Sequence, residues 1–431
     1  MTLELLDFKI KPQLEQLKNG IYPNRNRAKD NAKRILYLTQ YQWVSVLYLA
    51  VAIYCWQYKY FRHIYNNYLI FRQVYYHARE GLNLYAFYPK EYYDQNHYGP
   101  VFSMFISPFA ILPEGLGFLL WQIVNAMAFL IAIHMLPFTN RIKTLILLFC
   151  VIEFANTSHY MQSNAIIAAF IILSFVLVKR GKDEWATACI VLGTFIKLYP
   201  VIGFVFFLFS KNKLRFILST MIWMIIFFIC PMVISSPSYV IQSYHDWFTQ
   251  LAVKNSMNVT LGGTIDWCVM GVARRLSGDP TISNMPFLAV GMTIFAIPLL
   301  RFKQFASLKF RLQVLTSALI VTVIFSTGAE HPTFIIATAG AVIYIMMQNK
   351  PFTPFNITLL ILLLVITGLG PSDAFPRFMR DWIEYYAVKA WPCIIIWIKI
   401  AYELIFKNFI VEETTSARES YNTLIVNGQT N

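Results

Sequence analysis

Long apolar segments recur along nearly the whole chain, with only short polar stretches between most of them. Each is close to the ~20 residues that an α-helix needs to cross the hydrocarbon core of a bilayer. Only 13% of the 431 residues are charged, too few to cover a globular surface of this size. We therefore predict an all-α polytopic membrane protein with about 11–12 transmembrane helices. The segments lie near residues 43–60, 116–136, 141–158, 160–179, 184–208, 214–235, 284–301, 310–326, 331–347, 355–370 and 386–407.

The basic residues predict which side of the membrane each connection faces. Lysine and arginine concentrate in the N-terminal arm and in the stretches 179–182, 211–215 and 301–311. The positive-inside rule places all of these in the cytoplasm, so the remaining polar stretches are expected on the outer side. The net charge of +14 is better explained by this orientation than by nucleic-acid binding.

Two segments must change direction for this orientation to hold. The segment 184–208 must break at Lys197-Leu-Tyr-Pro200 and return to the side from which it came. The short run 99–113, which contains three prolines, must re-enter rather than cross. The alternative is that Arg141 and Lys143 violate the positive-inside rule.

The chain is expected to divide into three parts. A cytoplasmic N-terminal arm, residues 1–42, precedes a membrane domain at 43–407 without a cleavable leader. This domain is expected to carry two outer loops, at 61–98 and 236–283. Residues 408–431 are rich in threonine, serine and asparagine and are expected to form a disordered cytoplasmic tail. The six cysteines are scattered and imply neither a disulfide framework nor a metal cluster.

Polar side chains stand at the edges of apolar segments in two places. Lys197 is a lone cation in a long apolar stretch, and Gln162 and Asn164 lie about thirty residues before it. A charge at membrane depth is costly enough to suggest a functional site, here one facing the outer side. The alternatives are a lysine that extends its ammonium group to the interface and amides that join helices by hydrogen bonds.

Four short motifs follow one another in a fixed order. They are Gly81, Tyr85, Tyr98 and Pro100; Gln162 and Asn164; Ile196, Lys197 and Pro200; and Ser326 and His331. In order and spacing the chain resembles glycosyltransferase family 87, whose members are polytopic GT-C enzymes that use polyprenyl-phosphate sugars. One departure is Met161, where the family motif has glycine.

The resemblance implies a GT-C-like fold, with amphipathic helices in the first outer loop, and an integral-membrane glycosyltransferase. The expected reaction moves a hexose or pentose, mannose-like as the first guess, from a polyprenyl-phosphate sugar to an extracytoplasmic glycan or glycolipid. The expected partners are this lipid-linked donor, the acceptor and membrane lipids, with no nucleic acid and no obligatory cofactor or metal. The expected location is the plasma (inner) membrane, with the active site on the extracytoplasmic face.

The position at which the family usually carries its catalytic aspartate falls on Asn66 or Asn67 in this chain. An amide cannot accept a proton as a general base. We therefore predict Asp94 as the base, with His331 assisting at the phosphate. The other carboxylates expected near the outer face are Glu153, Asp246, Asp266 and Glu330.

Five residues are predicted to bind the donor phosphate or sugar: Lys197, Gln162, Asn164, Asn67 and Tyr98. Aromatic and amide side chains in the loop 236–283 suit a sugar surface, although a loop anchored at the membrane interface would use the same residues.

Two other functions remain open at this stage. A transporter or lipid flippase also needs polar groups and broken helices in the membrane, but no inverted repeat is found and the two large outer loops have no counterparts. The asparagines at positions 66 and 67 also fit a GT-C scaffold that has lost its catalyst.

Overall fold

The computed structural model describes residues 39–413 apart from 260, 350 and 371, and these residues form helices and connections without any strand. The predicted all-α class is therefore confirmed. The chain separates into two units, Met1–Trp43 and Val44–Asn431. The first unit is described only from residue 39, one residue before α3 begins, so the predicted N-terminal arm lies almost entirely outside the described residues.

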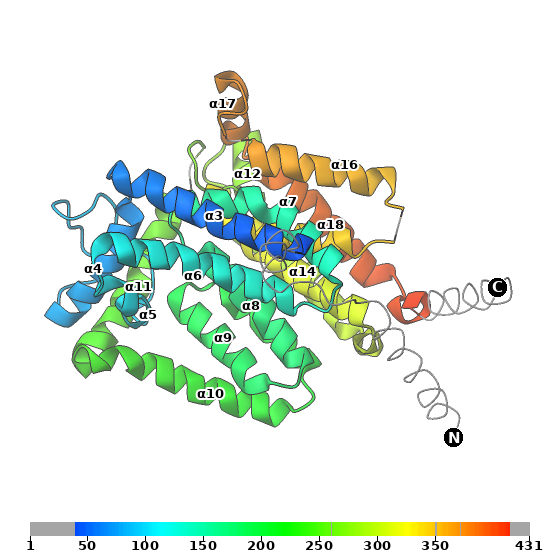
Figure 1. The fold of residues 1–431 in the computed structure, drawn as a ribbon. Helices are drawn as coiled ribbons and strands as arrows, with labels where there is room; N and C mark the ends of the chain where they lie inside the picture. Colours follow the sequence, from blue (N-terminus) through cyan, green and yellow to red (C-terminus); the bar gives the residue numbers. More distant parts are fainter. Residues whose placement is uncertain (1–38, 260, 350, 371, 414–431) are drawn as a thin grey trace, which may run out of the picture. The chain divides into compact units, whose positions relative to one another are not determined.

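Figure 1 shows the helices of the second unit packed side by side. The α-helices are α3 (Gln40–Phe61), α4 (Asn66–Glu80), α5 (Phe102–Ala110), α6 (Glu114–Met135), α7 (Asn140–His159), α8 (Asn164–Lys179), α9 (Asp183–Ile196), α10 (Lys213–Ile229), α11 (Pro237–Met257), α12 (Val269–Ser277), α13 (Asn284–Ala296), α14 (Leu308–Ile324), α15 (Phe334–Met346), α16 (Pro354–Leu362), α17 (Arg377–Tyr385) and α18 (Trp391–Phe406). The remaining elements are η1 (Tyr199–Phe209), η2 (Cys230–Val233), η3 (Ile297–Leu300), η4 (Phe302–Ala306), η5 (His331–Thr333) and η7 (Val388–Ala390), which are 3₁₀-helices, and the π-helix η6 (Leu363–Leu369).

Three described helices are long and apolar enough to cross a membrane: Glu114–Met135, Asn140–His159 and Lys213–Val233. Five further helical segments are apolar but shorter. On the last of the three long helices, side chains such as Leu214, Met221 and Ile225 are exposed, as expected for a surface that contacts lipid. The predicted total of about 11–12 spans remains a prediction.

The run 99–113 turns back toward the side on which it starts, as re-entry requires. The Tyr65 hydroxyl group, just before α4, donates to Glu114 at the start of α6, and the Tyr76 hydroxyl group donates to the Ala110 carbonyl oxygen at 3.0 Å. Both contacts join α4 to the chain at and just after the end of α5. Because α5 also follows the first loop directly, it begins and ends on the side of that loop. As a result α7 begins on the other side, where Lys143 lines the same cleft as Lys179.

The predicted break of the segment 184–208 is also confirmed. The helix α9 ends at Ile196, and the chain turns through Lys197 and Leu198 into η1. A Cβ atom on Gly193 would lie 2.6 Å from Pro200 Cγ, so the absence of a side chain at position 193 allows this turn to close. The Ser210 hydroxyl group then donates to Asp183 Oδ2 at 3.0 Å, which shows that η1 returns to the level at which α9 began.

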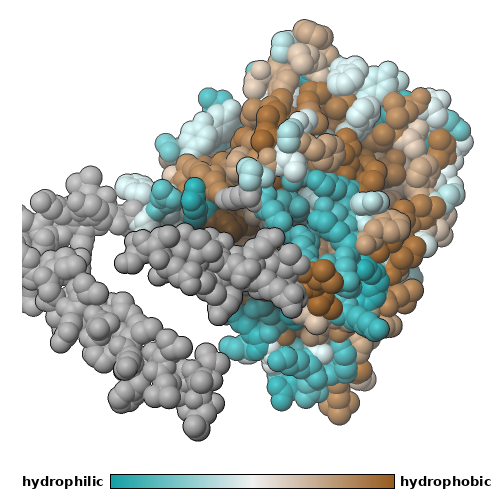
Figure 2. Space-filling view, turned by 90° about the vertical axis from the view of Figure 1, so that its right-hand side faces the viewer, coloured by the Kyte–Doolittle hydropathy of each residue, from teal (hydrophilic) through white to brown (hydrophobic). Residues whose placement is uncertain are grey.

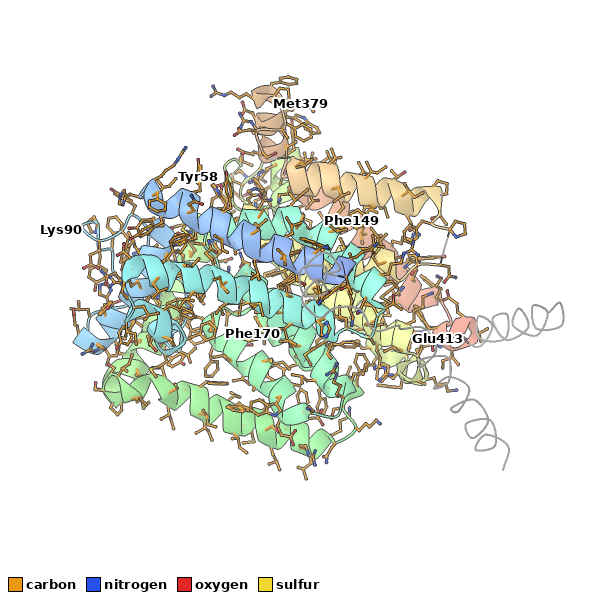
Figure 3. The ribbon with its side chains drawn as sticks, in the orientation of Figure 1. Tyr58, Lys90, Phe149, Phe170, Met379 and Glu413 are labelled. Atoms are coloured by element: carbon orange, nitrogen blue, oxygen red, sulfur yellow. The ribbon has the colours of Figure 1, made fainter. Side chains whose placement is uncertain are left out.

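These reversals give the helices of the second unit two distinct ends. We call one the basic end because it carries the cations of the stretches 179–182, 211–215 and 301–311. The other is the cavity end, described below. Lys90, in the loop after α4, and Glu413 lie at opposite ends (Figure 3). Figure 2 looks onto the basic end, where hydrophilic side chains gather next to hydrophobic ones.

The first residues of the predicted disordered tail are ordered at the basic end. Residues 409–413 are helical, Glu412 pairs with Lys309 at 2.6 Å and the Glu413 carboxylate accepts from Ser307 at 2.8 Å. The remainder of the tail, 414–431, lies outside the described residues.

A buried ion pair joins distant parts of the bundle. Lys389 in η7 pairs with Glu153 in α7, and both side chains are almost completely buried. The ammonium group also donates to the Thr367 carbonyl oxygen in the π-helix η6. Because an unpaired buried charge is strongly unfavourable, this pair fixes α7 against the last part of the chain.

Two connections between apolar segments contain more helix than the sequence patterns suggested. The loop 236–283 contains α11 and α12, and the stretch 371–385 contains α17. The start of α11 has two features that commonly begin a helix. The Ser236 side chain caps the helix by accepting a hydrogen bond from the Tyr239 backbone N–H, and Pro237 occupies the first helical position. This signal is independent of hydropathy, so a search for long apolar runs does not find it.

The two ends should be reachable from opposite sides of a sealed membrane vesicle. Tyr93 in the first outer loop is 85% exposed, and Lys211 is exposed at the basic end. In a cysteine-free background, Tyr93→Cys and Lys211→Cys should therefore react with a membrane-impermeant maleimide from opposite sides. Labelling of both positions from the same side would contradict the arrangement.

Candidate functional site

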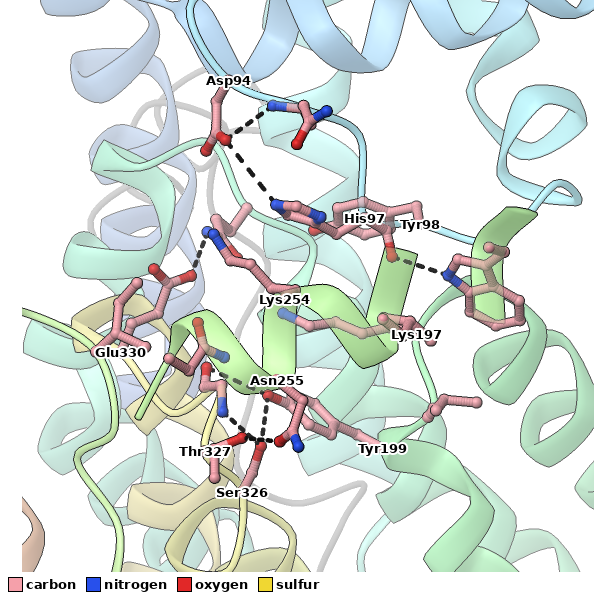
Figure 4. A pocket seen from close by; sticks show the side chains of 18 of the residues that line it. Asp94, His97, Tyr98, Lys197, Tyr199, Lys254, Asn255, Ser326, Thr327 and Glu330 are labelled. Carbon is pink, nitrogen blue, oxygen red and sulfur yellow. Dashed lines mark hydrogen bonds and ion pairs between the residues drawn. The ribbon is translucent and has the colours of Figure 1, made fainter. Parts of the chain in front are cut away.

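A cavity of about 530 Å³ opens at the cavity end. Its walls come from α4, the first outer loop, the turn at Lys197, α11 and the connection between α14 and η5. The polar and charged residues that line it are Asn67, Asp94, Gln95, His97, Tyr98, Tyr160, Gln162, Lys197, Tyr199, Lys254, Asn255, Asn258, Ser326, Thr327 and Glu330. Figure 4 shows that Asp94, His97, Lys197, Lys254 and Glu330 surround one space.

The first outer loop is fastened to the turn at Lys197 by backbone contact. The Gly99 N–H donates to the Ile196 carbonyl oxygen at 3.1 Å, which satisfies an acceptor left free where α9 ends. A Cβ atom at position 99 would lie 2.0 Å from the Phe195 carbonyl oxygen, so only glycine permits this approach. This contact brings Tyr98 and His97 beside Lys197.

Lys197 presents an unpaired cation to the cavity. Its ammonium group donates to Asn164 Oδ1 at 2.9 Å, and the rings of Tyr199 and Tyr98 lie 5.0 and 5.9 Å from it. Among the described residues no carboxylate lies within the 4.0 Å of an ion pair with this lysine. A partly buried cation whose nearest carboxylates lie beyond ion-pair distance favours an anionic ligand.

Gln162 connects this lysine to a carboxylate through a chain of hydrogen bonds. Its side-chain oxygen accepts from Asn164 Nδ2 at 3.1 Å, and its Nε2 donates to Glu330 Oε1 at 2.7 Å. Asn164 itself is fully buried and also donates to the Pro332 carbonyl oxygen at 3.0 Å. Asn164 therefore orients Lys197 and Gln162 from behind and does not line the cavity.

Asp94 and His97 form a second polar pair in the cavity wall. His97 Nε2 lies 3.9 Å from Asp94 Oδ1, and neither ring nitrogen has a hydrogen-bond partner. The surrounding backbone is rigid, because Trp247 Nε1 donates to the His97 carbonyl oxygen at 3.0 Å and the Asn96 side chain accepts from the Tyr98 N–H at 3.0 Å. Burial, reinforced by the nearby charge of Lys254, lowers the pKa of His97 to about 4, and Asp94 opposes this shift.

The structure brings five of the seven predicted site residues together, since Asp94, Lys197, Gln162, Asn67 and Tyr98 all line the cavity. The two asparagines at the start of α4 point in different directions. Asn66 accepts from the Tyr93 N–H at 2.8 Å, whereas Asn67 donates to the Tyr160 carbonyl oxygen at 2.8 Å at the cavity wall. Of the two positions expected for the family's aspartate, only 67 is in the cavity lining.

His331, predicted to assist at the phosphate, is not among the residues that line the cavity. Its ring packs 5.9 Å from Tyr160 and 6.2 Å from Trp267, and its Nδ1 is buried without a hydrogen-bond partner. The physical reason is tertiary: the 3₁₀ turn η5 begins at His331, and the rings of Tyr160 and Trp267 hold its imidazole away from the cavity, whereas Glu330 faces the cavity.

The other proposed carboxylates are engaged elsewhere. Glu153 pairs with Lys389, and Asp266 is fully buried in a salt bridge to Arg274 at 2.6 Å. Asp246 accepts from Gln242 at 2.7 Å and is not part of the cavity lining. Of the five carboxylates considered as bases, only Asp94 and Glu330 line the cavity.

Two basic side chains of the cavity were not predicted, His97 and Lys254. His97 lies three residues after Asp94 and directly before Tyr98. Its position between two predicted site residues could have indicated that it belongs to the site. Lys254 could not be placed without knowing that α11 is a helix. Within the described residues, no group of three or more His, Cys, Asp or Glu side chains could hold a metal ion.

Comparison with known proteins links this site to one enzyme family. The sequence pattern of glycosyltransferase family 87 matches residues 96–327, more than half of the 431 residues. The matched region includes Tyr98, Gln162 and Lys197 but begins two residues after Asp94. No curated protein and no solved structure matches the chain.

His97 should make the stability of the fold depend on pH. Its pKa is about 4 in the folded protein and 6.5 at its ordinary value, so on acidification the unfolded chain takes up the proton first. The free energy of unfolding is therefore highest above pH 6.5 and declines as the pH falls toward 4, by on the order of 3 kcal/mol.

Thermal unfolding of the detergent-solubilised protein across this pH range measures the effect. His97→Gln should flatten the dependence, whereas His245→Gln should not, because the His245 side chain is 76% exposed and lies outside the cavity. Equal slopes for His97→Gln and the parent would contradict the assignment.

Proposed function

The chain belongs to glycosyltransferase family 87, and we propose that this membrane glycosyltransferase takes a hexose or pentose from a polyprenyl-phosphate sugar. The acceptor would be an extracytoplasmic glycan or glycolipid, and a mannose-like sugar is the first candidate. The observation that carries the proposal is the cation of Lys197, which faces a cavity of about 530 Å³ with no carboxylate at ion-pair distance among the described residues.

The donor phosphate is proposed to bind at Lys197. A lysine is a compact point charge, and its hydrogen bond to Asn164 leaves further ammonium protons for phosphate oxygens. Gln162, Asn67 and Tyr98 line the same cavity and would contact the sugar or the phosphate. His331 lies outside the lining, so no phosphate contact is proposed for it.

Asp94 is proposed as the catalytic base. The acceptor oxygen forms its bond to the anomeric carbon while the bond from that carbon to the phosphate oxygen breaks. The acceptor proton passes to Asp94, and polyprenyl phosphate leaves with the bonding electrons near Lys197. The Asp94 side chain is 57% exposed, so an acceptor approaching from outside the cavity can reach its carboxylate.

Glu330 is the second candidate for the base. It also lines the cavity, but Gln162 already donates to one of its oxygens. Two alternative functions remain: a lipid flippase, and a scaffold that lost its catalyst when asparagine came to occupy position 67. Neither would release polyprenyl phosphate from a sugar donor, so product release separates them from the enzyme.

The proposed location is the plasma (inner) membrane, with the cavity end outside. The cations of the basic end support this orientation, since short basic loops are retained on the cytoplasmic side. No cofactor or metal is proposed to be obligatory, because Lys197 can balance the charge of the leaving phosphate.

Lys197→Met should weaken the binding of polyprenyl phosphate by about 10–100-fold, because one charge-assisted hydrogen bond contributes ~1.5–3 kcal/mol. The measurement is a titration of the purified protein with polyprenyl phosphate in neutral detergent. Lys211→Met, at an exposed lysine of the basic end, is the matched control. Affinity equal to that of the parent would show that Lys197 only directs its charge to the membrane interface.

Asp94→Asn should lower turnover by about 10²–10⁴-fold with little change in donor binding, as expected for loss of a general base. Turnover is followed as release of polyprenyl phosphate from a panel of polyprenyl-phosphate sugars, which also identifies the sugar. Glu330→Gln is the matched comparison, and Asp246→Asn tests a carboxylate outside the cavity.

The outcomes separate the candidates. If Asp94→Asn retains turnover and Glu330→Gln loses it, Glu330 is the base and the enzyme class stands. If the parent releases no polyprenyl phosphate from any donor but Asn67→Asp does, the chain is a scaffold that has lost its catalyst.

A further inference from the structure

A second cleft, of about 440 Å³, opens at the basic end between the end of α6, the start of α7 and the end of α8. Its polar lining consists of His134, Lys143, Lys179 and Arg180, and it contains no carboxylate. The rest of the lining is apolar and comes from Met135, Leu136, Pro137 and Val176. Nothing in the glycosyl-transfer chemistry uses this cleft, because it lies at the end opposite the cavity.

Lys143 is the unusual member of this group. The residue is only 9% exposed, and neither an ion pair within 4.0 Å nor a side-chain hydrogen bond of its ammonium group is found in the described part of the chain. The lysines that fix the fold differ from it. Lys389, for example, is buried against Glu153. The Lys143 ammonium group therefore keeps all of its protons available to an anion in the cleft, although the stem of this side chain is buried.

Arg180 extends this positive site. Its Nη2 donates to the Met135 carbonyl oxygen at 3.3 Å, which holds the guanidinium group across the cleft at the end of α6. Lys179 adds a third positive charge from the last turn of α8. The cleft also borders the first turn of α7, a 20-residue helix whose free backbone N–H groups favour negative charge.

We propose that this cleft binds the phosphate group of an anionic phospholipid. Three cations around one cleft match a phosphodiester, and basic pockets between the ends of membrane helices are a recurrent way of holding such headgroups. A lipid is favoured over free phosphate because apolar surface leads away from the cleft toward the hydrocarbon region. Ile131 on α6 is 46% exposed and Leu148 on α7 is 42% exposed, so acyl chains could lie along both helices.

The test uses the full-length protein in neutral detergent and measures the thermal unfolding midpoint during titration with phosphatidylglycerol, phosphatidylcholine or inorganic phosphate. Of these three ligands, only phosphatidylglycerol should raise the unfolding midpoint of the parent protein. Lys143→Gln should require about five- to tenfold more phosphatidylglycerol for the same shift, because it removes one of the cations that contact the phosphate. Lys211→Gln, an exposed lysine of the basic end outside the cleft, should respond like the parent.

Lys179→Gln provides a second variant should Lys143→Gln fail to fold, because Lys179 is exposed and lines the same cleft. It should also need more phosphatidylglycerol than the parent. The proposal is overturned if phosphatidylcholine or inorganic phosphate stabilises the parent as strongly as phosphatidylglycerol. It is equally overturned if the cleft variants respond like Lys211→Gln. Binding of polyprenyl phosphate should be unchanged in Lys143→Gln, because that lysine is remote from the cavity.

Discussion

The contact between Gly99 and the end of α9 joins the two segments on which the cavity depends. The chain stops being helical at Ile196, which leaves carbonyl groups without intrahelical partners, and the Gly99 N–H satisfies one of them at 3.1 Å. Glycine is required because any Cβ atom would collide with the Phe195 carbonyl oxygen. One backbone hydrogen bond therefore places the first outer loop, with His97 and Tyr98, against the turn that carries Lys197.

In two ion pairs of the described residues, Glu153 with Lys389 and Asp266 with Arg274, both side chains are almost completely buried. The first pair joins segments far apart in the sequence, and the second joins a loop to the helix that follows it. The ion pair to Arg274 holds the loop before α12, and Trp267 in that loop donates its backbone N–H to the Ala329 carbonyl oxygen at 3.0 Å. Paired charges thus stabilise the wall behind the site.

Lys197 and Lys143 differ from these paired groups, because neither has a carboxylate at ion-pair distance among the described residues. Each faces a cleft, and the two clefts lie at opposite ends of the helices. An unpaired cation in a cleft is more easily explained by a ligand than by stability, since burial without a partner is unfavourable. The same physical argument therefore links the proposed donor site to the proposed lipid site.

The sequence by itself determined the helical membrane class, the break at Lys197 and the polar residues Gln162 and Lys197 of the cavity. These features follow from hydropathy, proline and charge, which act over a few neighbouring residues. Only the tertiary structure decided that Asp94 and Glu330, rather than Glu153, Asp246 or Asp266, reach the cavity, and that His331 packs against Trp267 instead. The direction of a side chain depends on contacts between segments far apart in the sequence, as the ring of His331 against Trp267 shows, and local patterns do not contain those contacts.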